Sequence, residues 1–298
     1  MSTEIYYFSG TGNSLFVAKE LQKRLTNSNL IPIISLLNED KIRTNGKIIG
    51  LVFPVHALTV PVVVRKFLRK LDLSSAEYIF IIATRMGIIF NEFSSIENIL
   101  RKKKRNLNAH FLINMYSNDS KAKDYKTPTA EEIKRIEIKV LEQLLCISEI
   151  IKNRKNYKEP DKSYLINHPY NKIGNFFLEK IVISLLKLSE YTGGVNYFYY
   201  DSNCNGCGVC EKVCLSKKIK IENGHPNWEK NVLCYMCYAC LNFCPLSSIQ
   251  IKNIPGFKSY TQNVGRYNHP YARIKDLSMQ KALNTHSKLD KLILSDSN

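Results

Sequence analysis

The chain has 298 residues, of which 44% are hydrophobic and 23% are charged, and its formal net charge is +17. This length suits about two domains that each bury a core, and the hydrophobic share excludes a disordered chain. No apolar run reaches the roughly 18 residues that a membrane span needs, and the first residues lack the features of a secretory signal, so we expect a cytoplasmic protein without a membrane span.

The first half of the chain alternates short apolar runs with amphipathic stretches, which predicts a parallel sheet with helices on both faces. We expect one doubly wound α/β domain over residues 1–156, with a five-stranded sheet. Its strands are predicted at residues 4–8, 30–34, 47–53, 78–83 and 109–115, and its helices at residues 14–25, 61–71, 93–105 and 129–153.

The loop between the first strand and the first helix reads Ser9-Gly10-Thr11-Gly12-Asn13-Ser14. Glycines, hydroxyls and the free N–H groups of a helix start can cradle a phosphate. A dinucleotide loop would need a third glycine where this chain has Leu15, so the three hydroxyls suit a terminal monophosphate instead. The loop resembles the flavin mononucleotide (FMN) phosphate loop of flavodoxins, which implies a flavodoxin-like fold with FMN at the switch point between the first and third strands.

The same resemblance assigns the loops after the third and fourth strands to the flavin ring. An arginine there could stabilise the reduced flavin, and a histidine could donate a proton; the plainer alternatives are a surface arginine and a turn histidine. The residues implied are Pro54, Val55, His56 and Ala57 in one loop and Thr84, Arg85, Met86 and Gly87 in the other.

Residues 157–197 are less regular and read as a helical connector. Residues 176–188 predict an amphipathic helix, packed against a core or, as the alternative, lying on a membrane surface. Cys146, alone in an earlier helical stretch, is interpreted as a small buried apolar residue.

Residues 198–254 hold two copies of the spacing C-x2-C-x2-C-x3-C, offset by 30 residues, and each copy precedes a short apolar alternation. This spacing is typical of the paired [4Fe-4S] clusters of bacterial ferredoxins and predicts a small α+β domain. Zinc is the alternative for C-x2-C pairs, but ligand-like histidines are missing. The eight cysteines are Cys204, Cys207, Cys210, Cys214, Cys234, Cys237, Cys240 and Cys244.

The resemblance to two-cluster ferredoxins implies that the last cysteine of each run crosses to the other cluster. Leu215 follows the first run where proline follows the second, so the two clusters need not share one reduction potential. The implied ligand sets are Cys204, Cys207, Cys210 and Cys244 for one cluster, and Cys234, Cys237, Cys240 and Cys214 for the other.

Together the two halves resemble the flavodoxin-ferredoxin fusion proteins of anaerobic bacteria over residues 1–255. The sequence GRYNHP at residues 265–270, within the tail of residues 255–298, also resembles that family, and a helix is expected after it.

The resemblance implies an iron–sulfur flavoprotein that moves electrons between two [4Fe-4S] clusters and FMN. Its partner would be a redox protein, steered by the positive charge if acidic, or a small-molecule acceptor. One alternative is a pure electron-transfer module that docks with an oxidoreductase. Another is a basic nucleic-acid-binding protein with structural clusters, to which the run RKKKR at residues 101–105 points, although a solvated helix end explains that run. The sequence leaves open whether the protein is an enzyme.

Overall fold

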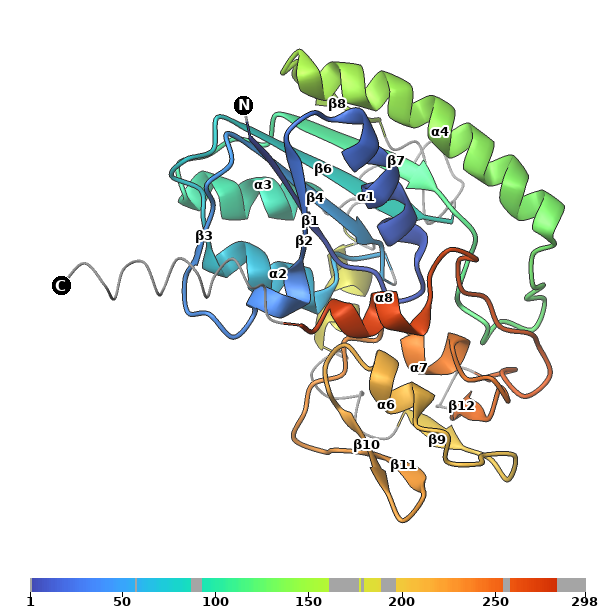
Figure 1. Cartoon of the computed structure of the whole chain (residues 1–298). Coiled ribbons are helices and arrows are strands. Elements are labelled where there is room, and N and C mark those ends of the chain that lie inside the picture. The colour runs from blue at the N-terminus through green and yellow to red at the C-terminus, as the bar shows by residue number, and fades with distance from the viewer. Residues whose placement is uncertain are drawn as a thin grey trace.

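The structure is a computed structural model that describes residues 2–56, 58–86, 93–160, 177, 180–188, 197–253 and 258–282. Figure 1 shows a larger α/β half, coloured blue to green, beside a smaller half, coloured yellow to orange, with the red C-terminal helix between them.

The α/β half is built on one parallel sheet with the strand order β2-β1-β4-β6-β7-β8. Its first five members in space follow the order 2-1-3-4-5 of flavodoxin-like sheets when they are counted along the chain. The α/β flavodoxin-like prediction is therefore confirmed for this half. The strands are β1 (Thr3–Tyr7), β2 (Ser28–Pro32), β4 (Ile48–Pro54), β6 (Tyr78–Arg85), β7 (Ala109–Asn114) and β8 (Tyr157–Lys158).

The sixth strand, β8, was not predicted, so the expected five-stranded sheet is wrong by one edge strand. The N–H of Tyr157 donates to the carbonyl of Asn108 at 3.0 Å and holds β8 parallel to β7. A two-residue strand is too short to show an alternating pattern in the sequence. The α/β half thus continues past residue 156, where its end was expected.

Helices cover both faces of the sheet, at the places that the sequence predicted (Figure 1). α1 (Asn13–Arg24) and α4 (Ala130–Lys152) pack with one face, and α2 (Val62–Lys70) and α3 (Phe93–Lys102) pack with the other. The remaining elements of this half are the short helix η1 (Ile33–Leu36) and the paired strands β3 (Ile42–Arg43) and β5 (Leu71–Asp72).

Cys146 is exposed on α4, so its predicted burial is wrong. Leu144 and Ile147 of the same helix are buried against the sheet. With 3.6 residues per turn, Cys146 lies 200° from Leu144 and 100° from Ile147 around the helix. Its position is therefore outside the stripe that faces the core.

The smaller half repeats one structural unit at the 30-residue offset of the cysteine runs. In each copy a cysteine loop leads into a short helix and then a strand; the sequence predicted the loop and the strand but not the helix between them. Each strand pairs with an antiparallel partner. The first copy has α6 (Val209–Val213) and β10 (Ile219–Glu222), paired with β11 (His225–Trp228); the second has α7 (Ala239–Asn242) and β12 (Ile249–Ile251), paired with β9 (Phe198–Tyr200).

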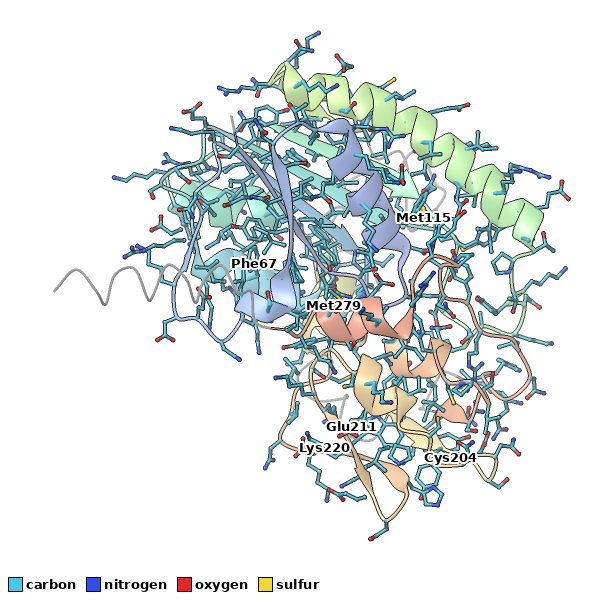
Figure 2. All side chains as sticks on the ribbon, viewed as in Figure 1. Phe67, Met115, Cys204, Glu211, Lys220 and Met279 are labelled. Atoms are coloured by element: carbon cyan, nitrogen blue, oxygen red, sulfur yellow. The ribbon has the colours of Figure 1, made fainter. Side chains whose placement is uncertain are left out.

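The C-terminal strap, residues 258–282, runs between the two halves and contains the expected helix, α8 (Ile274–Met279). Figure 2 shows Met279 between Phe67 of the α/β half and Glu211 of the smaller half. Of the expected connector helix, residues 180–188 are helical. Among the described residues no helix is long and apolar enough to cross a membrane.

One hydrophobic cluster joins the halves. It contains the sheet face under α2 and α3 and also buried side chains of the smaller half and the strap. The contributors from beyond residue 200 are Val213, Leu215, Ala239, Ala272 and Leu277. The two halves therefore share apolar burial.

Candidate cofactor sites

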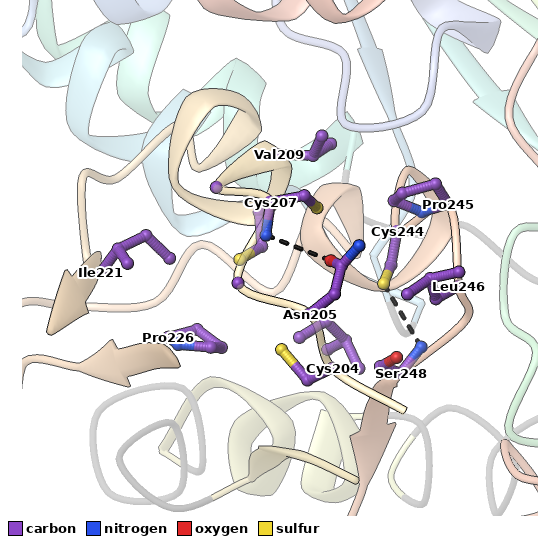
Figure 3. A pocket seen from close by; sticks show the side chains of 14 residues that line it. Cys204, Asn205, Cys207, Val209, Ile221, Pro226, Cys244, Pro245, Leu246 and Ser248 are labelled. Carbon is purple, nitrogen blue, oxygen red and sulfur yellow. Dashed lines mark hydrogen bonds between the residues drawn. The ribbon is translucent and has the colours of Figure 1, made fainter. Parts of the chain in front are cut away.

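The first cysteine site is a pocket lined by Cys204, Cys207, Cys210 and Cys244 (Figure 3). Cys244 comes from the second repeat, and the other three come from the first. Cys207 is exposed, whereas Cys210 is buried. The space between these side chains is about 320 Å³, counted together with the open solvent at its mouth.

Burial, together with the charges of the neighbouring Cys244, Cys207 and Cys204, raises the pKa of the Cys210 thiol to about 12. Four thiols that share one space repel as thiolates, so they are held together best by a cationic group. The donor set therefore fits an iron cluster.

The second cysteine site groups Cys234, Cys237 and Cys240 with Cys214 of the first repeat. Burial raises the pKa of Cys237 to about 12, with Cys234 and Cys214 adding to the shift. Burial likewise raises the pKa of Cys240. Four neighbouring cysteines add to this shift: Cys214, Cys234 and Cys237 of the second site and Cys210 of the first. The two sites are thus close enough to influence each other.

The two cysteine loops share their backbone conformation. Gly206 and Gly208 have φ values of 71° and 73°, and the equivalent residues of the second loop, Met236 and Tyr238, have φ values of 52° and 58°. A side chain in this left-handed region costs roughly 1–3 kcal/mol, and the conformation persists only where the surrounding structure imposes it. The second loop accepts that strain and keeps its three cysteines arranged as in the first loop.

Among the described residues no three His, Cys, Asp or Glu side chains converge on a point that could hold a single metal ion. Each thiolate of a four-iron cluster binds a different iron, so such a cluster needs cysteines around a larger space.

The predicted phosphate loop is buried, and each of its three hydroxyls has a partner inside the protein. The Ser9 hydroxyl accepts from the N–H of Gly12 at 3.1 Å, and the Thr11 hydroxyl accepts from the side chain of Asn118 at 2.9 Å. Ser14 Oγ lies 2.8 Å from Thr84 Oγ1. Ser9 and Thr11 act as acceptors here, which leaves their O–H groups free to donate to a phosphate.

The start of α1 offers further donors. No described residue accepts a hydrogen bond from the backbone N–H of Asn13, Ser14 or Leu15, and all three residues are buried. Buried N–H groups normally have a partner. An anion at this position would satisfy them, so the loop fits a phosphate.

The C-terminal strap covers this loop. The N–H of His269 donates to the carbonyl of Thr11 at 2.8 Å, and the Tyr267 hydroxyl donates to the side chain of Asn13 at 3.0 Å. The Gln280 amide accepts from the Ser9 N–H at 3.2 Å and donates to the Ser9 carbonyl at 2.9 Å. The loop is therefore held from outside the α/β half.

The predicted ring loops lie at the same edge of the sheet as the phosphate loop. The N–H of Val55 donates to the carbonyl of Thr84 at 2.8 Å, which joins the two loops. Pro54 ends β4, Arg85 ends β6, and Met86 is exposed. Ala57 and Gly87, also predicted here, lie outside the described residues.

His56 packs against the second cysteine loop. Its ring lies 5.7 Å from that of Phe8, which in turn lies 6.4 Å from Tyr235, the residue between Cys234 and Met236. Burial lowers the pKa of His56 to about 4, against the effect of its hydrogen bond to the Tyr235 backbone. His56 is therefore a neutral imidazole at neutral pH.

Several residues around these sites were not identified from the sequence. No sequence motif marks Asn118 or Gln280 as part of the site, because a single amide side chain has no characteristic spacing to other residues. Tyr267 and His269 lie in the segment GRYNHP, whose resemblance to the fusion family implies no role for either side chain. His269 is fully buried and stacked on Phe16 at 4.5 Å.

No family model matches the chain, and no curated protein matches it significantly. Solved structures with flavodoxin-like folds match about half of it. Smu.1420 from Streptococcus mutans UA159 matches at 11% identity and a TM-score of 0.35, covering 48% of this chain and 98% of that one. A flavodoxin from the domain Archaea matches at 14% identity and a TM-score of 0.31, covering 49% and 99%.

The two-electron reduced flavodoxin of Megasphaera elsdenii matches at 16% identity and a TM-score of 0.29, covering 47% of this chain and 98% of that one. At identities and TM-scores this low, the matches assign no activity. The flavodoxin-like topology rests on the strand order.

Proposed function

We propose that the chain is an iron–sulfur flavoprotein that moves electrons between two [4Fe-4S] clusters in its smaller half and an FMN at the carboxyl edge of its parallel sheet. The observation that carries the proposal is the grouping of Cys244 with Cys204, Cys207 and Cys210 around one pocket. These cysteines are up to 40 positions apart, and they form the crossed set that a two-cluster ferredoxin would use.

The flavin part is supported by the donors at the start of α1 and by the meeting of the two ring loops at Val55 and Thr84. FMN exchanges one or two electrons, whereas each cluster exchanges one, so the two kinds of cofactor together would connect one-electron and two-electron partners. Ser9, Thr11 and the N–H groups of α1 would hold the phosphate, and the strap would keep water from that loop.

The protein also brings the second cysteine site against the proposed flavin edge. Gly10 of the phosphate loop lies so close to Cys237 that a Cβ on Gly10 would be 2.8 Å from the Cys237 Cβ. Phe8, His56 and Tyr235 line the same contact. The second site is therefore the one through which the two halves would exchange electrons, and the first site, with exposed Cys207, faces outward.

Two residues of the basic run at residues 101–105 donate to the backbone of residues 69–74. Lys103 Nζ donates to the carbonyls of Arg69 and Leu71, each at 2.9 Å, and Arg105 donates to those of Leu73 and Ser74, each at 2.8 Å. These contacts favour a local structural role for the run over nucleic-acid binding.

Anaerobic purification with iron, sulfide and flavin quantification tests both parts of the proposal. We expect about eight irons and one FMN per chain. Zinc in place of iron would end the cluster proposal, and cluster-loaded protein that does not bind FMN would end the flavin proposal.

Paired cysteine variants test the crossed ligand sets. Cys204→Ala with Cys244→Ala removes two ligands of the first site, so one intact four-iron cluster should remain. Cys204→Ala with Cys214→Ala removes one ligand from each site, so none should remain. The reverse pattern would show that the runs do not cross, and Cys146→Ala serves as the control that keeps both clusters.

A further inference from the structure

Lys218 is a buried cation beside the second cysteine site. It follows Cys214 by four residues, and only 1% of it is exposed. Its ammonium donates to the carbonyls of Glu229 and Val232, the latter at 2.6 Å, and its own carbonyl accepts from the N–H of Glu229 at 2.8 Å. Lys218 thus holds the segment that leads into Cys234.

A buried ammonium needs a counter-charge, because two carbonyl dipoles offset only part of the cost of removing it from water. Among the described residues no carboxylate lies within 4.0 Å of Lys218. Its hydrogen bond to the Val232 carbonyl, two residues before Cys234, and its position four residues after Cys214 place Lys218 beside two cysteines of the second site. The counter-charge for Lys218 would therefore come from the thiolates of the second site and from what they hold.

The internal repeat provides a comparison. The residue equivalent to Lys218 in the second copy is Ser248, which carries no charge; its N–H donates to Cys244 Sγ at 3.3 Å. The cation near Cys244 is Arg266, which comes from the strap and also has Asp201 in its surroundings. The fully buried lysine is therefore specific to one copy of the repeat.

We propose that Lys218 raises the reduction potential of the cluster at the second cysteine site, so that electrons that reach the outward-facing first site collect beside the α/β half. This inference rests on the proposed function. A positive charge stabilises the more negative, reduced state of a cluster, and it acts strongly in a buried, low-dielectric place. Lys218 would act through this field and by positioning the segment before Cys234.

The test is an anaerobic redox titration of the cluster-loaded protein, followed by electron paramagnetic resonance, in wild type and in Lys218→Met. The double variant Cys204→Ala with Cys244→Ala, which should keep only the second site, identifies that site's signal. In Lys218→Met we expect the equilibrium constant for reduction of the second cluster to fall at least tenfold, which lowers its reduction potential by about 59 mV for one electron. The change at the first cluster should be smaller. Lys218→Arg, which keeps the charge, should stay closer to wild type.

Lys220→Met is the matched control, because Lys220 lies two residues further along the chain, in β10, and its side chain is 49% exposed. It should leave both potentials near wild type. Lys218→Gln, whose amide can still donate to a carbonyl, replaces the methionine variant if that one fails to assemble. An intact second cluster with an unchanged potential in a neutral variant would overturn the inference and leave the proposed function standing.

Loss of the second cluster from both neutral variants would also overturn the inference, because Lys218 would then build the site and not tune it. Wild-type protein without iron clusters would instead overturn the proposed function itself.

Discussion

Gly10 and Gly12 of the phosphate loop lie in close contact with other parts of the chain, Gly10 with the smaller half and Gly12 with the strap. A Cβ on Gly10 would overlap the carbonyl oxygen of Cys237, and a Cβ on Gly12 would overlap Ala272 and lie 2.8 Å from the Cβ of His269. Gly12 also has a φ of 101°, which L side chains rarely adopt. The glycines therefore serve the docking of the two halves as well as the shape of a phosphate loop.

We expect Gly10→Ala to lower the free energy of unfolding by about 1–3 kcal/mol, because the added methyl group must push the backbone of Cys237 away. Denaturant unfolding measures the change, and iron analysis should show partial loss at the second cysteine site. Gly46→Ala is the control: its Cβ would lie 3.1 Å from Glu4 Cγ and 3.2 Å from the Ile48 carbonyl oxygen, without overlapping either, and should cost less. Equal effects of the two variants would contradict this account.

The C-terminal strap is the element that binds both halves. On the α/β side Lys19 forms an ion pair with Asp276 at 2.9 Å, and Gln280 bonds Ser9 twice. On the other side Lys281 donates to the carbonyl of Lys212 at 2.7 Å, and Arg266 donates to that of Ile249 at 3.1 Å. Of these contacts, the buried amide pair at Gln280 is the one most shielded from water.

Gln280→Ala should destabilise the protein by about 1–3 kcal/mol, because it leaves the buried N–H and carbonyl of Ser9 without these partners. The free energy of unfolding in urea measures this. Gln262→Ala is the matched control, since Gln262 is exposed and makes one hydrogen bond, to the Tyr199 hydroxyl at 3.0 Å. If the two variants lost the same stability, the strap would not hold the loop as described.

At the scale of the whole molecule, the shared hydrophobic cluster makes the two halves depend on each other. Leu215 and Ala239 of the smaller half and Leu277 of the strap are at most 1% exposed within the cluster that also contains the core under α2 and α3. Separating the halves would expose these side chains, at a cost of roughly 1.5–3 kcal/mol for each leucine.

We therefore expect both halves of the cluster-loaded protein to unfold in one transition. The fluorescence of Trp228, the single tryptophan of the chain, reports on the smaller half, and far-ultraviolet circular dichroism reports mainly on the α/β half. The two midpoints in denaturant should coincide. Two separated transitions would mean that the shared cluster does not couple the halves.

The amino-acid sequence predicted the features that depend on local spacing. The strand and helix positions of the α/β half followed from apolar periodicity, and the repeat of a cysteine loop before a strand, β10 or β12, followed from the 30-residue offset of the cysteines. Periodicity shows that a residue faces a core, and ligand spacing shows which side chains lie on one loop. Neither pattern predicts the two-residue strand β8, or that Cys146 lies on the exposed side of its helix.

The contacts between segments far apart in the chain could not be predicted from the sequence and are known from the tertiary structure. Ser9 meets Gln280 across 271 positions, and Gly10 meets Cys237. Each depends on how two independently patterned halves pack, because the packing of surfaces is set by their shapes and not by any period along the chain. The sequence alone shows that eight thiols and three loop hydroxyls are present and which cofactors such groups can bind. Where the cysteine loops meet the phosphate loop, at Gly10, Tyr235 and the strap, is decided by the packing of the folded chain.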